Sequence, residues 1–230
     1  MMSHSEPLKF IKGHLYITLE GEDWVIDTGS PASFGDIATL VIAGESYSVS
    51  KDMAGLDAST LSSHVHHKTV GLIGTDILNN FNILFDVSEN LISFSKESII
   101  MKGEVLETSH VMGIPVVNVL VDGAIKKMFF DTGAQVSYVQ RDVLDNYPMT
   151  GKIEDFYPGI GAFQTTTHDV EISFGSLQTR MSCGSLPEML GMTLLLAGTD
   201  GIIGNEIMMN RSFGYFPLEN KIIISKPLQK

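Results

Sequence analysis

Two aspartates begin the same tripeptide, Asp-Thr-Gly, once in each half of the chain. The first tripeptide starts at Asp27 and the second at Asp131, 104 residues later, and each follows a short apolar segment. One such tripeptide indicates only a turn, because Asp and Gly populate turns for local reasons. A pair predicts chemistry, since two carboxyls in contact cannot both ionise cheaply and so share one proton. One of them can then act as general base on a water while the other acts as general acid.

The two tripeptides belong to a repeat that covers most of the chain. Residues 71–78 (GLIGTDIL) are echoed by residues 201–208 (GIIGNEIM), and the second copy carries 26 additional residues between the two landmarks. Landmarks in the same order indicate one ancestral lobe that was duplicated, and two copies are too few for a solenoid. We therefore expect an N-terminal lobe of residues 1–103 and a C-terminal lobe of residues 104–230, with Asp27 and Asp131 meeting between them.

The pattern within each lobe predicts an all-β fold with short helices. Residues 15–19 and 116–120 are rich in β-branched side chains, turn signals follow them, and a second apolar strand leads into each Asp-Thr-Gly. In the first lobe we expect residues 64–70 to form a half-buried strand. Helical segments are expected to be brief, over residues 76–80, 188–196 and 205–209.

Composition excludes several classes of function. The net charge of −12 would repel phosphate backbones and anionic lipid, so we expect no nucleic-acid partner and no membrane partner. No stretch approaches the roughly 18 apolar residues of a membrane-spanning helix. The single Cys183 excludes an intrachain disulfide and favours a cytoplasmic location. Residues 1–7 lack the pattern of a secretory signal, and we expect no long prosegment ahead of the first strand.

The residues around the two tripeptides resemble those of the aspartic proteases over nearly the whole chain. Residues 73–78 (IGTDIL) are similar to the Ile-Gly-Arg-Asp/Asn-Leu-Leu segment of retroviral enzymes, and residues 200–204 (DGIIG) to the Asp-Gly-Ile-Leu-Gly segment of pepsin-like ones. The resemblance implies a pseudo-twofold, bilobal acid-protease fold built from two retropepsin-like lobes, in a single-chain, bacterial-type member. It also implies an endopeptidase that needs no cofactor and no metal.

The resemblance assigns a role to each residue of the two loops. Asp27 and Asp131 would be the catalytic pair that activates a water for attack on a peptide bond. The threonines would cross-bond the two loops, and the glycines would let backbone N–H groups approach the carboxylates. The supporting residues are Thr28, Gly29, Ser30, Thr132, Gly133 and Ala134. Because only Ser30 carries a hydroxyl at the fourth position, we expect it to bond Asp27 and to leave the shared proton on Asp131.

A flap that closes over the substrate is the third part that the resemblance implies. Residues 159–163 resemble the Gly-Ile-Gly-Gly-Phe flap tip of retroviral proteases, and they would bind the backbone of an extended peptide. The candidate flap residues are Gly159, Ile160, Gly161, Ala162 and Phe163. Only 46 residues separate Asp27 from Gly74, against 72 between Asp131 and Gly204. We therefore expect a single flap, contributed by the second lobe.

Three alternative interpretations accompany this one. His64, His66 and His67 invite comparison with a metal site, but adjacent histidines without a carboxylate partner favour an ordinary loop. Cys183 has no nearby histidine that would activate it as a nucleophile, so a small buried residue is expected. A protease-like fold that binds peptides without cutting them is the main rival function. In either case one chain holds both aspartates, so a monomer suffices.

Overall fold

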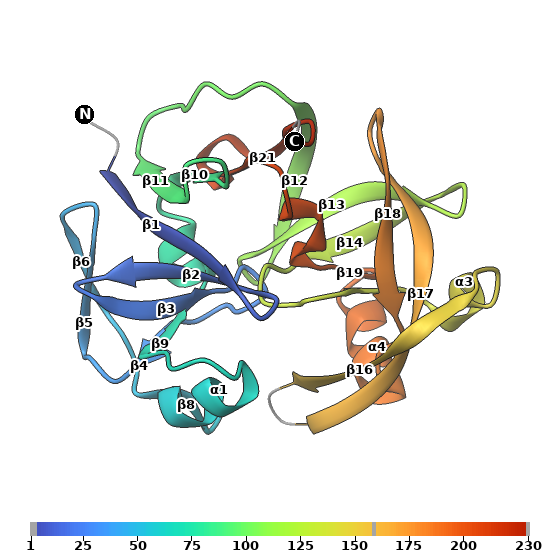
Figure 1. Ribbon diagram of the computed structural model, residues 1–230, viewed down its shortest axis with the longest axis horizontal. Helices are drawn as coiled ribbons and strands as arrows, with labels where there is room; N and C mark the ends of the chain where they lie inside the picture. Colours follow the sequence, from blue (N-terminus) through green and yellow to red (C-terminus); the bar gives the residue numbers. More distant parts are fainter. Residues whose placement is uncertain (1–3, 158–159, 229–230) are drawn as a thin grey trace.

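The computed structural model describes residues 4–157 and 160–228, and β-strands dominate it, as the sequence predicts (Figure 1). In Figure 1 the blue-to-teal strands of the first half lie on the left and the yellow-to-orange strands of the second half lie on the right. Residues 96–103 connect the last strand of the first half to the first strand of the second. No helix in the described ranges is long and apolar enough to cross a membrane.

The first half is built around an antiparallel meander that ends at Asp27. The meander consists of β1 (His4–Ile11), β2 (His14–Leu19) and β3 (Glu22–Ile26). Glu20 and Gly21 join β2 to β3 and both have positive φ, which is the backbone of the tight turns that match strand twist. On its other edge β3 pairs in parallel with β9 (Gly71–Ile73), and β9 pairs with the short β4 (Phe34–Gly35).

The second half repeats this arrangement and ends its meander at Asp131. Here the strands are β12 (Glu104–Val111), β13 (Ile114–Val121) and β14 (Ala124–Phe130). β14 pairs in parallel with β19 (Gly201–Ile203), in the register Phe130 to Ile203 that matches Ile26 to Ile73. β15 (Ser137–Tyr138) then pairs with β19. The repeated sequence therefore produces a repeated strand order.

A six-stranded sheet joins the two halves. Its strand order is β1, β11 (Leu91–Ser95), β10 (Asn82–Asp86), β20 (Phe213–Phe216), β21 (Lys221–Ile224) and β12. The central pair β10–β20 takes one strand from each half. One cluster of buried apolar side chains crosses this boundary, and Phe85 of the first half contacts Phe213 of the second edge to face, with ring centroids 6.2 Å apart. The two halves therefore share one core beneath the Asp-Thr-Gly loops.

A long hairpin distinguishes the second half from the first. It consists of β16 (Met149–Tyr157) and β17 (Gly161–Phe174), and β18 (Leu177–Gly184) pairs with the far end of β17. In Figure 1 the free end of the hairpin reaches toward the first half. The corresponding part of the first half holds only two short hairpins, made of β5 (Thr39–Ile42), β6 (Glu45–Ser48), β7 (Asp52–Met53) and β8 (Leu56–Asp57).

The helices are short, as expected, but residues 64–70 do not form the predicted strand. The prediction for residues 188–196 is confirmed by α4 (Glu188–Leu196), and α2 (Thr75–Leu78) and the 3₁₀ turn η1 (Asn205–Met208) lie near their predicted positions. The strand expected over residues 64–70 is wrong. Those residues begin at the end of α1 (Ala58–His64), whose first turn is capped by Asp57 accepting from the Thr60 N–H. The remaining helical turns are α3 (Arg141–Leu144) and η2 (Pro217–Glu219).

Candidate active site

Both aspartates stand at the end of a buried strand in a parallel pair. The backbone N–H of Asp27 donates to the Ile73 carbonyl at 3.0 Å, and that of Asp131 donates to the Ile203 carbonyl at 2.9 Å. Each bond continues the pairing of β3 with β9 or of β14 with β19 by one residue. Because equivalent residues make the last hydrogen bond of the parallel pair in both halves, the two side-chain carboxyls lie at equivalent positions at the ends of their strands.

The structure brings the two carboxyls into contact. Asp27 and Asp131 hydrogen-bond to each other through their side chains. Each carboxyl also accepts a hydrogen bond from a backbone N–H of its own loop. The Gly29 N–H donates to Asp27 Oδ1 at 2.7 Å, and the Gly133 N–H donates to Asp131 Oδ1 at 2.8 Å. The Ala134 N–H donates to the same Asp131 oxygen at 3.1 Å. Each carboxyl therefore has one oxygen fixed by its own loop.

The protonation of the pair follows from burial and mutual repulsion. Burial, the charge of Asp27 and the hydrogen bond that the protonated form of Asp131 donates to Asp27 raise the pKa of Asp131 well above the ordinary carboxyl range. Burial also raises the pKa of Asp27, although the hydrogen bonds that it receives oppose that shift. The two acids thus favour a state with one shared proton. The expected placement of that proton on Asp131 stays a prediction.

The reason expected for that assignment is wrong. The hydroxyl of Ser30 does not bond Asp27; it donates to the Ala32 carbonyl at 2.8 Å and lies 3.4 Å from the Met53 sulfur. Ser30 approaches Asp27 through its backbone instead, with its N–H 3.4 Å from the Asp27 carbonyl. The shifts in the pKa values of the two acids therefore come from desolvation and from their mutual contact. The residue at the fourth position of each loop, Ser30 or Ala134, approaches its aspartate through its backbone.

The two threonines cross-bond the loops as expected. The Thr28 hydroxyl donates to the Phe130 carbonyl at 2.7 Å and accepts from the Thr132 N–H at 3.0 Å. Reciprocally, the Thr132 hydroxyl donates to the Ile26 carbonyl at 2.9 Å and accepts from the Thr28 N–H at 3.0 Å. Both threonines are fully buried. Four buried hydrogen bonds therefore fix the loop of one half to that of the other.

The glycines leave the space in which the carboxyls meet. A Cβ on Gly133 would lie 2.6 Å from the Asp27 carboxyl carbon, and a Cβ on Gly29 would overlap the carboxyl of Asp131. Real Cβ atoms do not approach other atoms so closely, so any larger residue would push the opposite aspartate away.

Replacing Gly133 by Ala is therefore expected to separate the two carboxyls and to lower the pKa of Asp131 toward the ordinary carboxyl range, because the charge of Asp27 would no longer lie against it. Titration of the carboxyl groups by NMR measures this change. Gly44→Ala serves as the control, because Gly44 lies in a distant hairpin turn with open space where a Cβ would go. An unchanged pKa of Asp131 in Gly133→Ala would show that the close approach does not set the protonation of the pair.

Sequence reasoning missed several residues that hold the loops. Ser33 and Ser137 are 104 residues apart, like the aspartates, and their hydroxyls accept from the N–H groups of Gly74 and Gly204 at 2.8 and 3.1 Å. The Asn205 side chain donates to the carbonyls of Thr132 and Gly13, at 2.9 and 2.8 Å. The shared offset of the two serines was a signal that could have identified them.

The long hairpin lies over the aspartates and is attached to both halves. The Tyr138 hydroxyl donates to Asp155 on β16, so this strand is anchored to its own half. The next residue, Phe156, stacks on His64 of α1, with ring centroids 3.6 Å apart and ring planes at 20°. Phe156 also packs against an apolar cluster of the first half that includes Tyr16. The hairpin therefore spans the two halves.

The predicted flap residues fall at the end of this hairpin. Gly159 lies outside the described residues, and Ile160 is in the turn. Gly161, Ala162 and Phe163 begin β17 and pair with Tyr157, Phe156 and Asp155. Phe163 lines the cavity that contains both aspartates, and Ala162 lines the adjoining one.

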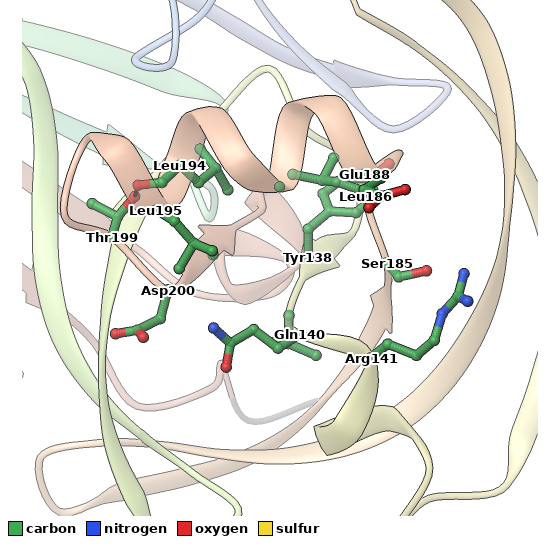
Figure 2. Close-up of a pocket in the computed structure, with 13 residues that line it drawn as sticks. Tyr138, Gln140, Arg141, Ser185, Leu186, Glu188, Leu194, Leu195, Thr199 and Asp200 are labelled. Atoms are coloured by element: carbon green, nitrogen blue, oxygen red, sulfur yellow. Dashed lines mark hydrogen bonds between the residues drawn. The ribbon is translucent and has the colours of Figure 1, made fainter.

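Three adjoining cavities form a cleft at the aspartates, and the hairpin lines two of them. The middle one, about 340 Å³, contains Asp27 and Asp131. On the first-half side it shares Met53 and Phe156 with a cavity of about 200 Å³. On the other side it shares Tyr138 and Leu186 with a cavity of about 450 Å³ beneath α4. Figure 2 shows this last cavity, with α4 on one side and the polar side chains of Gln140, Arg141 and Asp200 on the other.

The histidines and the cysteine of the rival interpretations lie apart from one another, and His64 and His66 line the cavity on the first-half side of the cleft. The ring of His67 contacts Asp23 at 2.9 Å, whereas His64 stacks on the hairpin. Among the described residues no group of three or more His, Cys, Asp or Glu side chains is placed to hold a metal ion. Cys183 is fully buried, and burial, with the nearby charges of Glu206 and Asp169, raises its pKa to about 12.

Comparison of the sequence with protein-family models and with curated proteins finds no match.

Proposed function

We propose that this chain is an aspartic endopeptidase with a pseudo-twofold, bilobal acid-protease fold. The observation that carries the proposal is the contact between Asp27 and Asp131, two carboxyls that sit at equivalent strand ends of a duplicated structure and share one proton. A turn residue has no need of such a partner. Two acids with separated pKa values in a cleft supply a general acid and a general base at once.

Hydrolysis would proceed in two steps. Charged Asp27 takes a proton from a water whose oxygen attacks the carbonyl carbon of the peptide, while Asp131 gives its proton to the carbonyl oxygen. The product is a tetrahedral diol on the former carbonyl carbon. In the second step the diol loses a hydroxyl proton to one aspartate, the other aspartate protonates the amide nitrogen, and the carbon–nitrogen bond breaks. After each turnover the two aspartates again hold one proton between them.

The shape of the cleft supports a peptide as the substrate. Its three cavities extend to both sides of the aspartates, which suits a chain that enters and leaves the site, as an endopeptidase requires. The strands of the hairpin line the cavity that holds the aspartates, and their backbone would pair with an extended peptide. Both aspartates come from one chain, so a monomer completes the site. The acidic composition and the lone, buried Cys183 support a cytoplasmic location.

Incubation with a defined mixture of synthetic peptides at pH 3–8 tests the proposal. We expect cleavage within the peptides by the wild-type protein, inhibition by pepstatin, the general inhibitor of the family, and no cleavage by Asp27→Asn. Because the shared proton must be present, the rate should fall as pH rises through the raised pKa of the pair. Peptide binding without cleavage at any pH would favour the non-catalytic module instead.

The stack of His64 on Phe156 yields a prediction about the hairpin. Replacing His64 by Ala removes a contact worth about 0.5–1.5 kcal/mol, so the hairpin should open more often and KM should rise about 2- to 10-fold. Hydrogen exchange of the β16–β17 amides should increase in parallel. His64→Phe retains a stacking ring and should restore both values. An unchanged exchange rate in His64→Ala would mean that the stack does not hold the hairpin.

A further inference from the structure

Helix α4 exposes large apolar side chains to solvent. It carries one charged residue, Glu188, and Leu190 is its one buried residue. Met189, Met192 and Leu196 are 70%, 59% and 89% exposed. Because positions i, i+3 and i+7 share one face of a helix, these three side chains form an apolar stripe on the outer side of α4, the α4 stripe. A contiguous exposed apolar patch of this kind marks an interaction surface.

The first half folds the equivalent helix without an apolar stripe. The offset of 130 residues that relates β9 to β19 also relates the first residue of α1 to the first residue of α4. At the three positions of the α4 stripe the first half has Ser59, Ser62 and His66. Ser59 and His66 are exposed there, and Ser62 is half-buried. The outer side of the equivalent helix is therefore polar, and the apolar stripe is specific to the second half.

The α4 stripe is continuous with the cleft. Leu195 is 58% exposed and also lines the cavity beneath α4, and Figure 2 shows it on the side of the helix that faces Gln140 and Asp200. On the helix surface Leu195 neighbours Met192, which lies three residues before it. Leu186 lines both the cavity beneath α4 and the cavity that contains the aspartates. Apolar side chains therefore extend from the aspartates to the outer side of α4.

We propose that the α4 stripe binds an apolar segment of the substrate, outside the cleft and several residues away from the cut bond. The inference extends the proposed function and rests on it. A chain that leaves the cleft through the cavity beneath α4 would pass Leu195, and its next residues would reach the stripe. Because α4 is about 14 Å long and an extended chain covers about 3.3 Å per residue, about four substrate residues would lie along it. Methionine side chains adapt to partners of different shape, so the stripe would select apolar character rather than one sequence.

Other occupants match the α4 stripe less well. Burying a Met or Leu side chain removes roughly 60–120 Å² from water, so the exposed side chains of α4 supply at most about 500 Å². A second copy of the chain would therefore bury less than the roughly 800 Å² per partner of a stable interface. Helices that lie in a lipid surface carry Lys or Arg. α4 has only the acidic Glu188, and the whole chain has a net charge of −12.

The test lengthens each peptide of the synthetic mixture, at either end, by Leu-Ser-Leu-Ser-Leu or by Ser-Gly-Ser-Gly-Ser. At one of the two ends we expect the leucine extension to raise kcat/KM about 10-fold over the serine–glycine extension, since burying one leucine accounts for that factor. Met192→Ser combined with Leu196→His installs the residues of the first half and should remove this preference. Ile125→Ser is the matched control and should keep it, because Ile125 is an exposed apolar residue of β14 beside a separate cavity. Met192→Leu, which stays apolar, should keep it as well.

Binding of the same peptides to Asp27→Asn, followed by fluorescence anisotropy, reads the α4 stripe without turnover. If wild type cuts no peptide but Asp27→Asn binds the leucine extensions more tightly, and the double substitution at Met192 and Leu196 removes this difference, the proposed function fails and the stripe stands. If wild type cuts peptides without preferring either leucine extension, the stripe fails and the proposed function stands. A preference that survives the double substitution would also overturn the stripe. So would a dimer, or binding to phosphatidylcholine vesicles, that the double substitution abolishes, because the occupant would then be another copy or a lipid surface.

Discussion

Asp131→Asn is expected to abolish peptide cleavage and, at the same time, to stabilise the folded protein. The amide cannot donate or accept the proton that hydrolysis needs, so kcat/KM should fall by about 10⁴-fold, the upper range for a positioned acid–base group. The same amide resembles the protonated acid that the fold already favours, because burial and the charge of Asp27 raise the pKa of Asp131. A gain in stability would thus accompany the loss of activity.

The sign of the stability change follows from proton linkage. The unfolded chain releases the Asp131 proton near the ordinary value of 3.8, whereas the folded protein keeps it to a higher pH. The native state therefore binds more protons in that window, and wild-type stability falls as pH rises from about 3.8 through the raised pKa of the folded protein. Asp131→Asn lacks this loss, so its advantage should develop across that window and then remain constant.

Urea denaturation at several pH values, together with the peptide assay, checks both parts. Asp27→Asn should also abolish cleavage, with a smaller gain in stability, because the hydrogen bonds to Asp27 oppose the rise of its pKa. Asp36→Asn, on the exposed surface, is the control for amide substitution. Cleavage near the wild-type rate in either active-site variant would end the case for a shared-proton mechanism.

The second large effect is expected when either cross-bonding threonine loses its hydroxyl. Thr28→Val keeps the shape of the side chain but leaves the buried Thr132 N–H and the buried Phe130 carbonyl without partners. Each unsatisfied group costs about 1–3 kcal/mol, so the free energy of unfolding should fall by about 2–6 kcal/mol. Activity should fall as well, because the loops that carry the aspartates would separate.

A comparison of urea midpoints measures this loss, and Thr28→Ser is the matched control because it retains the hydroxyl. We expect the serine variant to remain within about 1 kcal/mol of wild type, since it loses only a methyl group. Thr132→Val should resemble Thr28→Val, because its hydroxyl makes the reciprocal bonds to the Thr28 N–H and the Ile26 carbonyl. If both valine variants unfold at the wild-type midpoint, the cross-bonds contribute nothing to the joining of the halves.

Local sequence patterns predicted most of the secondary-structure elements but not the contacts that individual side chains make. The strand content, the turn after β2 and the helix over residues 188–196 follow from side-chain type and spacing, which act within a few residues. The strand expected near His64 was wrong, because α1 ends at His64 and the chain then turns, with His66 at positive φ. The hydroxyl of Ser30 was also assigned wrongly, since its bond to the Ala32 carbonyl depends on the fold of the loop beyond it.

By itself, the sequence determined that two Asp-Thr-Gly loops would end duplicated strands, because the repeat can be read from residue identity alone. The same repeat predicted that Asp27 and Asp131 meet between the two halves. Only the tertiary structure decided the other contacts across them, Phe156 with His64 and His14 with Gln135. The partners in these two pairs are separated by 92 and 121 residues, and nothing in their local sequence selects them. The shared sheet and core place them together, and desolvation there sets the proton affinity of the aspartates and of His14.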